Sequence, residues 1–188
     1  MKKFLVIFGP PGAGKGTQAI RLRDYLQVPH ISTGDMFRYH IKNRTELGQK
    51  AQAYTNGGGL VPDEITIAMV KERLTQQDVQ NGFLLDGFPR SVNQAQALDE
   101  ILIDLKLKLE GVLNIFVPEE EIKQRLAKRA LLEGRQDDSD ETVIQNRLQT
   151  YRAQSEPCLI YYRPRALVFD IDGVGSIDEI FERIKAVL

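Results

Sequence analysis

Short apolar segments alternate along the chain with longer segments of mixed polarity. The apolar segments show no alternation of apolar and polar positions, which is typical of strands buried on both faces. The longer segments between them are long enough for crossover helices. The pattern predicts strands at residues 4–8, 29–31, 83–85, 112–117 and 166–171. This order predicts an α/β fold of three layers, a five-stranded parallel sheet between helices, with ligands at the carboxyl ends of the strands.

Acidic residues mark the expected helix starts. Negative side chains stabilise the first turn of a helix, so helices are predicted to begin near Asp63, Glu119 and Asp178.

Two polar segments interrupt the alternation of strands and helices. Residues 56–62 are rich in glycine, and residues 133–140 form a short polar segment between two predicted helices. Either could be a plain connection.

Size, charge and cysteine content narrow the class of protein. A chain of 188 residues is expected to form one domain over residues 1–188. Its 25 Lys and Arg nearly balance 26 Asp and Glu, which argues against a nucleic-acid or membrane-surface partner. Cys158 is the only cysteine and is interpreted as a small core residue. No segment approaches the ~20 apolar residues of a membrane span, so a soluble cytoplasmic protein is expected.

A glycine-rich segment follows the first predicted strand directly and leads into a helix that runs to about Leu26. It reads GPPGAGKGT at residues 9–17. Glycines let backbone N–H groups approach phosphate oxygens closely, the helix N-terminus favours negative charge, and Lys15 adds a positive charge. The segment therefore predicts a nucleoside triphosphate site. Gly16 occupies the position where Ser or Thr is usual, with Thr17 one place later, so Mg²⁺ ligation by that hydroxyl is not expected with the usual geometry.

A carboxylate ends the third predicted strand. Asp86 closes the run FLLD at residues 83–86. A lone aspartate at a strand end is usually a turn residue. Beside a phosphate-binding loop, however, it is interpreted as a Mg²⁺ ligand acting directly or through water.

Further polar groups are expected at the same sheet edge. Residues 32–38, STGDMFR, follow the second strand and open a helix with a hydroxyl and, one turn on, Arg38. Residues 87–90, GFPR, follow Asp86 and bring Arg90 to this edge, with Gln94 expected one helical turn from it. The Gln94 amide could lie at the surface or could read the edge of a base.

Four arginines flank the polar segment at residues 133–140. Arg125 and Arg129 are spaced to share one helix face, where like charges repel unless an anion lies between them. Arg135 lies within the segment and Arg147 on the next helix. Solvated arginines are the common explanation for any one of these residues. Together with a phosphate loop, the four suit a lid that closes over polyphosphate.

Taken together, these motifs resemble the adenylate kinases of the nucleoside monophosphate kinase family, over essentially the whole chain. The resemblance rests on GPPGAGKGTQ at 9–18, STGDMFR at 32–38, GLVPDEI at 59–65, FLLDGFPR at 83–90 with Gln94, and the arginines around DETVIQNR. It implies transfer of a phosphoryl group from ATP to AMP to give two ADP, with Mg²⁺. It also implies a P-loop fold, a monophosphate-binding arm at residues 32–61, a short lid at residues 130–140, and a monomer.

The resemblance also implies roles for individual residues. ATP would be bound by Gly12, Ala13, Gly14, Lys15, Gly16, Thr17, Arg125, Arg129 and Gly175. AMP would be bound by Thr33, Arg38, Gly59, Leu60, Val61, Gly87, Phe88, Pro89, Arg90 and Gln94, with Arg135 and Arg147. The catalytic charges would come from Lys15, Arg90, Arg129, Arg135 and Arg147, while Asp137 and Asp138 would brace the closed lid.

Two features separate this chain from relatives of the same general kind. Its lid segment is too short for a zinc-binding lid, so no zinc is expected. A short lid also occurs in UMP/CMP kinases, which makes a pyrimidine acceptor the nearest alternative. Thr33 and Gln94 favour adenine, because the pyrimidine relatives generally carry Ala and Asn at these positions. A nucleotide-dependent switch without a second substrate is a further alternative, but it would not need a second phosphate-binding arm.

Overall fold

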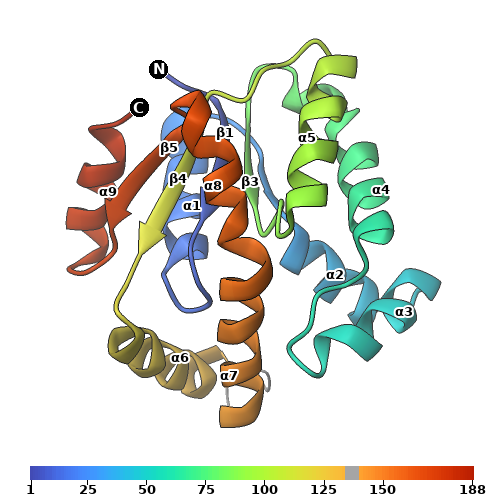
Figure 1. Ribbon diagram of the computed structural model, residues 1–188, viewed down its shortest axis with the longest axis vertical. Helices are drawn as coiled ribbons and strands as arrows, with labels where there is room; N and C mark the ends of the chain where they lie inside the picture. The colour runs from blue at the N-terminus through green and yellow to red at the C-terminus, as the bar shows by residue number, and fades with distance from the viewer. Residues whose placement is uncertain (134–139) are drawn as a thin grey trace.

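The computed structural model describes residues 1–133 and 140–188 and has three layers, with a sheet between two groups of helices (Figure 1). The strands are parallel and lie in the order β2-β3-β1-β4-β5. They are β1 (Phe4–Phe8), β2 (His30–Ser32), β3 (Phe83–Asp86), β4 (Gly111–Phe116) and β5 (Val168–Asp172). The predicted α/β fold with five parallel strands is confirmed.

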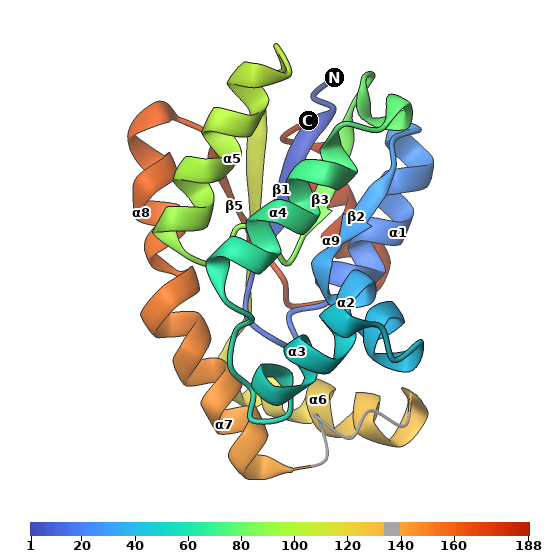
Figure 2. The ribbon, with the colours of Figure 1, turned by 90° about the vertical axis from the view of Figure 1, so that its right-hand side faces the viewer.

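Helices cover both faces of this sheet. Helices α1 and α9 pack on one face, and α4, α5 and α8 lie on the other (Figures 1 and 2). The α-helices are α1 (Lys15–Leu26), α2 (Thr33–Lys42), α3 (Glu46–Thr55), α4 (Asp63–Leu74), α5 (Val92–Asp104), α6 (Glu119–Glu133), α7 (Glu141–Thr150), α8 (Pro157–Tyr162) and α9 (Ile177–Lys185). Short helical turns are η1 (Gln77–Val79), the π-helical η3 (Tyr151–Ser155) between α7 and α8, and η4 (Arg163–Arg165).

The core explains the apolar strand pattern. In β1, Leu5 and Ile7 pack towards α1 and α9, while Val6 and Phe8 pack towards α5 and α8. All four side chains are buried, because successive residues of a strand face opposite sides of a sheet and helices cover both sides. Cys158 lies fully buried in the core on the α5 and α8 side of the sheet, as the sequence predicted. Burial raises the pKa of its thiol to about 12.

The strand ends differ from the predicted ones for local reasons. Residue 166 does not begin the last strand, because Ala166 has a left-handed backbone (φ 54°) that ends η4. Strand β4 ends at Phe116 rather than Val117, since Phe116 pairs with Asp172, the last residue of β5. The Gly173 N–H then donates to the Phe116 carbonyl and closes this edge.

Two helices extend beyond the sheet edge. Helices α2 and α3 pack against each other away from the main layers (Figure 2). They share with the following segment a small core made of Phe37, Ala51, Val61 and Met69. This region coincides with the arm predicted at residues 32–61, whose role stays a prediction. Most of the lid predicted at 130–140, residues 134–139, lies outside the described residues.

Within residues 1–133 and 140–188, no helix combines the length and the apolar character that crossing a membrane requires.

Candidate active site

The glycine-rich segment connects the carboxyl end of β1 to α1. Gly9 has φ +145°, and a Cβ atom there would lie 2.5 Å from the Ile115 carbonyl oxygen. Gly14 caps α1 with φ +90°. Both positions require glycine, because side chains rarely tolerate these conformations. The loop therefore lies against β4 with the N-terminus of α1 directly behind it, which is the geometry of a phosphate-binding loop.

Lys15 is the first residue of α1 and lies across this loop. Its Nζ donates hydrogen bonds to the carbonyl oxygens of Gly9 (2.7 Å) and Pro10 (2.9 Å). Burial lowers the pKa of Lys15 to about 8; Asp86 opposes this effect, and the charges of Arg90, Arg147 and Arg129 add to it. The structure thus gathers positive charge around Lys15, and a bound polyphosphate would favour its protonated form.

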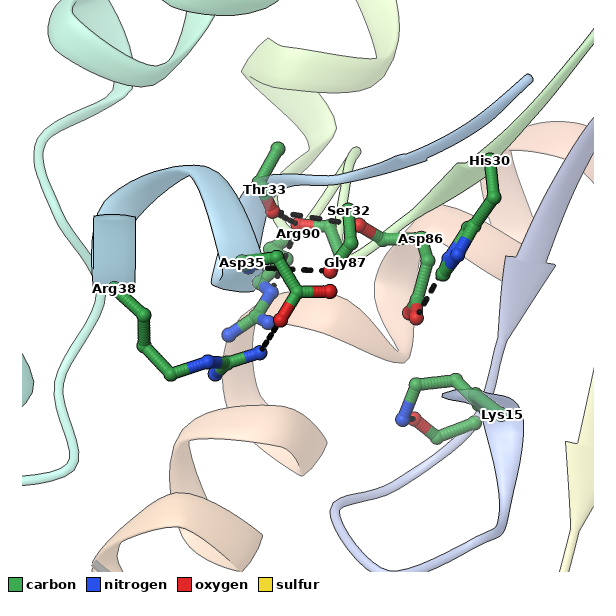
Figure 3. Close-up of polar contacts among 10 residues, drawn as sticks. Lys15, His30, Ser32, Thr33, Asp35, Arg38, Asp86, Gly87 and Arg90 are labelled. Carbon is green, nitrogen blue, oxygen red and sulfur yellow. Dashed lines mark hydrogen bonds and ion pairs between the residues drawn. The ribbon is translucent and has the colours of Figure 1, made fainter. Parts of the chain in front are cut away.

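Asp86 ends β3 beside Lys15, as Figure 3 shows. His30 on the neighbouring strand β2 contacts it, with 3.4 Å between His30 Nε2 and Asp86 Oδ2. Burial raises the pKa of Asp86, but the hydrogen bond with His30 and the charge of Lys15 outweigh burial and keep the pKa below its usual range. Asp86 is therefore an ionised oxygen donor. The two residues are far apart along the chain, so no sequence motif reveals this contact.

The segment after Asp86 holds Arg90 and Thr33 together. The carbonyl oxygen of Gly87 accepts hydrogen bonds from Thr33 Oγ1 (2.7 Å) and from Arg90 Nε (2.9 Å) (Figure 3). The Phe88–Pro89 peptide bond is cis, and the Phe88 side chain packs in the core. Arg38, on α2, pairs with Asp35 at the same opening. Residues from three predicted motifs thus meet at one edge of the sheet.

The relation between Arg90 and Gln94 differs from the expected one. Arg90 precedes α5, whose N-cap is Ser91, so the two residues do not lie one turn apart on a helix. Instead, the backbone N–H of Arg90 donates to Gln94 Oε1 (2.8 Å). Gln94 Nε2 donates to Asp63 Oδ1 (2.7 Å), and Ser91 Oγ donates to Asp63 Oδ2 (2.8 Å). In the sequence Asp63 is recognisable only as a helix start, and Ser91 belongs to no motif, so their contacts with Gln94 and with each other are not predicted.

A cleft of about 750 Å³ opens between the glycine loop, the α2–α3 region and α7. The predicted site residues that line it are Lys15, Thr33, Arg38, Gly59, Leu60, Val61, Gly87, Pro89, Arg90, Gln94 and Arg147. A volume of this order is typical of small-molecule sites. The phosphate loop and the buried Gln94 thus line the same cleft.

The predicted ATP-side residues lie around the loop and α6. Ala13 is buried, while Gly16 and Thr17 are exposed on the first turn of α1. Arg125 has protein partners that its spacing from Arg129 does not reveal. Its guanidinium donates to Glu121 (2.8 Å), to the Gly173 carbonyl oxygen (2.8 Å) and to the Ala13 carbonyl oxygen (3.4 Å). It thereby joins the glycine loop to the segment that contains Gly175.

The lid arginines are described only in part. Arg129 on α6 and Arg147 on α7 are half-buried, and the charges of both act on Lys15. Arg147 also lines the cleft. Arg135, Asp137 and Asp138 lie outside the described residues, so their predicted roles stay predictions.

The donor groups fit a magnesium ion that arrives with a nucleotide. Mg²⁺ prefers oxygen ligands and usually takes one or two carboxylates together with phosphate and water. Asp86 supplies one ionised carboxylate beside Lys15, whereas Gly16 supplies no side-chain oxygen. Over residues 1–133 and 140–188, no group of three or more His, Cys, Asp and Glu side chains gathers as metal ligands.

Comparison with known proteins places this geometry in a family. The adenylate kinase family model matches residues 7–167. The adenylate kinase of Thermobifida fusca is 53% identical over 184 residues, covering 98% of this chain and 97% of the relative. That of Leptospira biflexa is 47% identical over 182 residues, covering 97% of each chain. That of Kocuria rhizophila is 50% identical over 184 residues, covering 98% and 97%. On these grounds the chain belongs to the adenylate kinase family.

Proposed function

We propose that the protein transfers the terminal phosphoryl group of ATP directly to AMP, giving two ADP, with the two nucleotides at opposite ends of one cleft. The activity is that of its family, a nucleoside monophosphate kinase. The observation that supports this assignment of sites most strongly is that Lys15, Arg90 and Arg147 line the same cleft as Thr33 and Gln94. A cation cluster between two binding regions is what phosphoryl transfer needs.

The ATP phosphates are assigned to the loop at residues 9–17. Its backbone N–H groups and the N-terminus of α1 favour polyphosphate. The Lys15 ammonium group, which donates to the Gly9 and Pro10 carbonyl oxygens, would turn to the bound phosphate instead. Arg129 and Gly175 are assigned to the rest of ATP. Arg125 is assigned an indirect role, because it holds the loop against the segment near Gly175.

AMP is assigned to the other end of the cleft. Its base would lie near Gln94 and the backbone of residues 59–61, and its phosphate near Arg38 and Arg90. Thr33 fixes the Gly87 carbonyl oxygen and so helps shape the segment that carries Arg90. This assignment orients the AMP phosphate towards Lys15, in line for attack.

The reaction then needs positioning and charge rather than a nucleophilic side chain. An oxygen of the AMP phosphate forms a bond to the γ-phosphorus of ATP while the bond from that phosphorus to the bridging oxygen breaks, and the electron pair stays with the departing ADP. Lys15, Arg90 and Arg147 stabilise the charge on the moving group. Arg129 and Arg135 are proposed to join them when the lid closes, which also excludes water.

Magnesium is proposed to accompany ATP, with Asp86 holding it directly or through water. When bound, the ion supplies charge neutralisation and a fixed geometry for the phosphates. Asp86 is held ionised by His30 and Lys15, so it can serve as this ligand at neutral pH. ATP, AMP and ADP are the proposed partners, and a cytoplasmic monomer that binds neither nucleic acid nor membrane remains the expectation from the sequence.

The assignment is tested by measuring ADP formation from Mg·ATP with AMP, UMP, CMP and GMP offered separately. Rapid turnover with AMP and slow turnover with the others is expected. A preference for UMP or CMP would move the protein to the pyrimidine branch. ADP release that does not depend on an acceptor would indicate an ATPase switch.

A further inference from the structure

The side-chain amide of Gln94 is held by two partners of opposite hydrogen-bonding character. Its oxygen accepts from the backbone N–H of Arg90 at 2.8 Å. Its nitrogen donates to the Asp63 carboxylate at 2.7 Å. Gln94 is almost fully buried, with 1% of its surface exposed, and it lines the cleft. The orientation of this amide is therefore set by the protein before any nucleotide binds.

These partners permit only one orientation of the amide. A backbone N–H can only donate, and an ionised carboxylate can only accept. Rotating the amide by half a turn would place oxygen against the Asp63 carboxylate and NH₂ against the Arg90 N–H. Both contacts would be repulsive, and buried polar groups without partners are costly.

Asp63 is itself fixed in place. It is the first residue of α4, a position at which acidic side chains are common. Its second oxygen accepts from the Ser91 hydroxyl at 2.8 Å. The same Ser91 oxygen accepts from the Gln94 backbone N–H at 3.1 Å and caps α5. The Asp63 carboxylate of α4 thus fixes the Gln94 amide of α5. Ser91, the N-cap of α5, in turn holds the carboxylate.

The locked amide has a defined order of donor and acceptor to offer to a base. An amide oxygen accepts two hydrogen bonds and an amide nitrogen donates two, so each atom can make one more bond besides those to Arg90 and Asp63. A 6-aminopurine carries a donor at its amino group beside the N1 acceptor, and it matches this order. A 6-oxopurine carries the reverse, an acceptor at C6 beside an N1–H donor.

We propose that Asp63 is a specificity-determining positioning residue, which locks the Gln94 amide so that the acceptor site takes 6-aminopurine and rejects 6-oxopurine monophosphates. The inference rests on the proposed function, since it places the acceptor base at Gln94. It makes discrimination depend on a residue that does not touch the base. Without the Asp63 carboxylate, only the Arg90 N–H opposes rotation of the amide, and a rotated amide would match a 6-oxopurine.

The test replaces Asp63 by Asn, which can donate or accept and so removes one of the two constraints on the amide, leaving only the Arg90 N–H. The values of kcat/KM are measured with AMP and with IMP, which differ only at position 6 and the adjacent N1 proton. The ratio of the two values is expected to fall by about tenfold or more in Asp63→Asn, the factor that one mispaired buried polar group produces. The KM for ATP and the melting temperature serve as checks of folding.

A matched control is Glu64→Gln, the same carboxylate-to-amide change at the next, exposed residue of α4. It should leave the AMP-to-IMP ratio unchanged. In a Gln94→Leu background, which has no amide to orient, Asp63→Asn should not change the ratio further. An equal loss for both acceptors in Asp63→Asn would overturn the proposal. So would a change of the ratio by Asp63→Asn that is the same with and without the Gln94→Leu substitution.

Failure of the proposed function itself would look different. It would show as a wild-type protein that does not use AMP at all. A wild type that uses AMP well, together with an Asp63→Asn variant that discriminates as sharply as the wild type, would refute only the role of Asp63.

Discussion

Replacing Lys15 by Met should separate stability from activity, because the lysine is held in an unfavourable state until phosphate binds. The pKa of Lys15 lies at about 8 instead of the usual 10.5, with burial as the main cause. This lowering corresponds to roughly 3 kcal/mol by which the folded protein disfavours the protonated lysine. The unfolded chain binds this proton more tightly. The destabilisation is therefore fully present below pH 8 and disappears as the pH rises to about 10.5.

The substitution also removes two favourable contacts. The hydrogen bonds from Lys15 Nζ to the Gly9 and Pro10 carbonyl oxygens are lost, at about 1 kcal/mol each. The net expectation at pH 7 without nucleotide is a gain of about 1 kcal/mol, or a melting temperature higher by about 2–4 °C for a chain of this size. Phosphoryl transfer should fall by about 10²–10³-fold or more, since a central charge on the moving group is removed.

Thermal unfolding with and without Mg·ATP measures both halves of this prediction. Saturating ATP at about 100 times its Kd stabilises the wild type by about 2.7 kcal/mol, and it should stabilise Lys15→Met much less. The order of melting temperatures is therefore expected to reverse when ATP is added. A variant that is less stable than the wild type without nucleotide would refute the electrostatic reasoning. Near-normal transfer activity would refute the assignment of the phosphate loop.

Three further outcomes are expected. In the wild type, kcat/KM for ATP should fall above pH 8 as Lys15 of the free enzyme loses its proton. The value of kcat should hold to higher pH, because bound phosphate raises the pKa of Lys15. Identical pH profiles for the two constants would contradict this. Gly48→Ala should raise the KM for AMP several-fold and leave the KM for ATP nearly unchanged. The new Cβ would lie 2.2 Å from the His40 carbonyl oxygen and would separate α2 from α3. Equal changes in both constants would count against the α2–α3 region as the AMP arm. Cys158, with its pKa raised to about 12 by burial, should react with a thiol reagent only as fast as the protein unfolds; rapid modification of the native protein would contradict its core position.

The sequence was informative where a pattern has one physical solution. Apolar runs between longer helical segments permit little besides a parallel sheet covered on both faces, and the structure confirms the five strands. Helix starts at Asp63 and Glu119 agree with the structure, because a carboxylate in the first turn has a direct electrostatic reason to be there. The strand expected from residue 166 begins later, since a propensity-based prediction cannot detect the left-handed backbone of Ala166.

Contacts between distant residues were beyond the sequence analysis. The glycine loop and Asp86 could be assigned to one sheet edge, because parallel strands bring their carboxyl ends together. The pairing of His30 with Asp86 and of Asp63 with Gln94 depends on side-chain directions that no spacing encodes. Arg125 shows the same limit: its spacing from Arg129 does not reveal that its guanidinium donates to Glu121 and to two backbone carbonyl oxygens.

The most direct test of the central claim is the initial rate of ADP formation with ATP and AMP varied together. Direct transfer within one cleft requires both nucleotides to be bound at once, so double-reciprocal plots are predicted to intersect. Parallel lines would indicate a phosphorylated protein intermediate, and a rate that does not depend on AMP would show that the cleft holds no acceptor; either result would contradict the account.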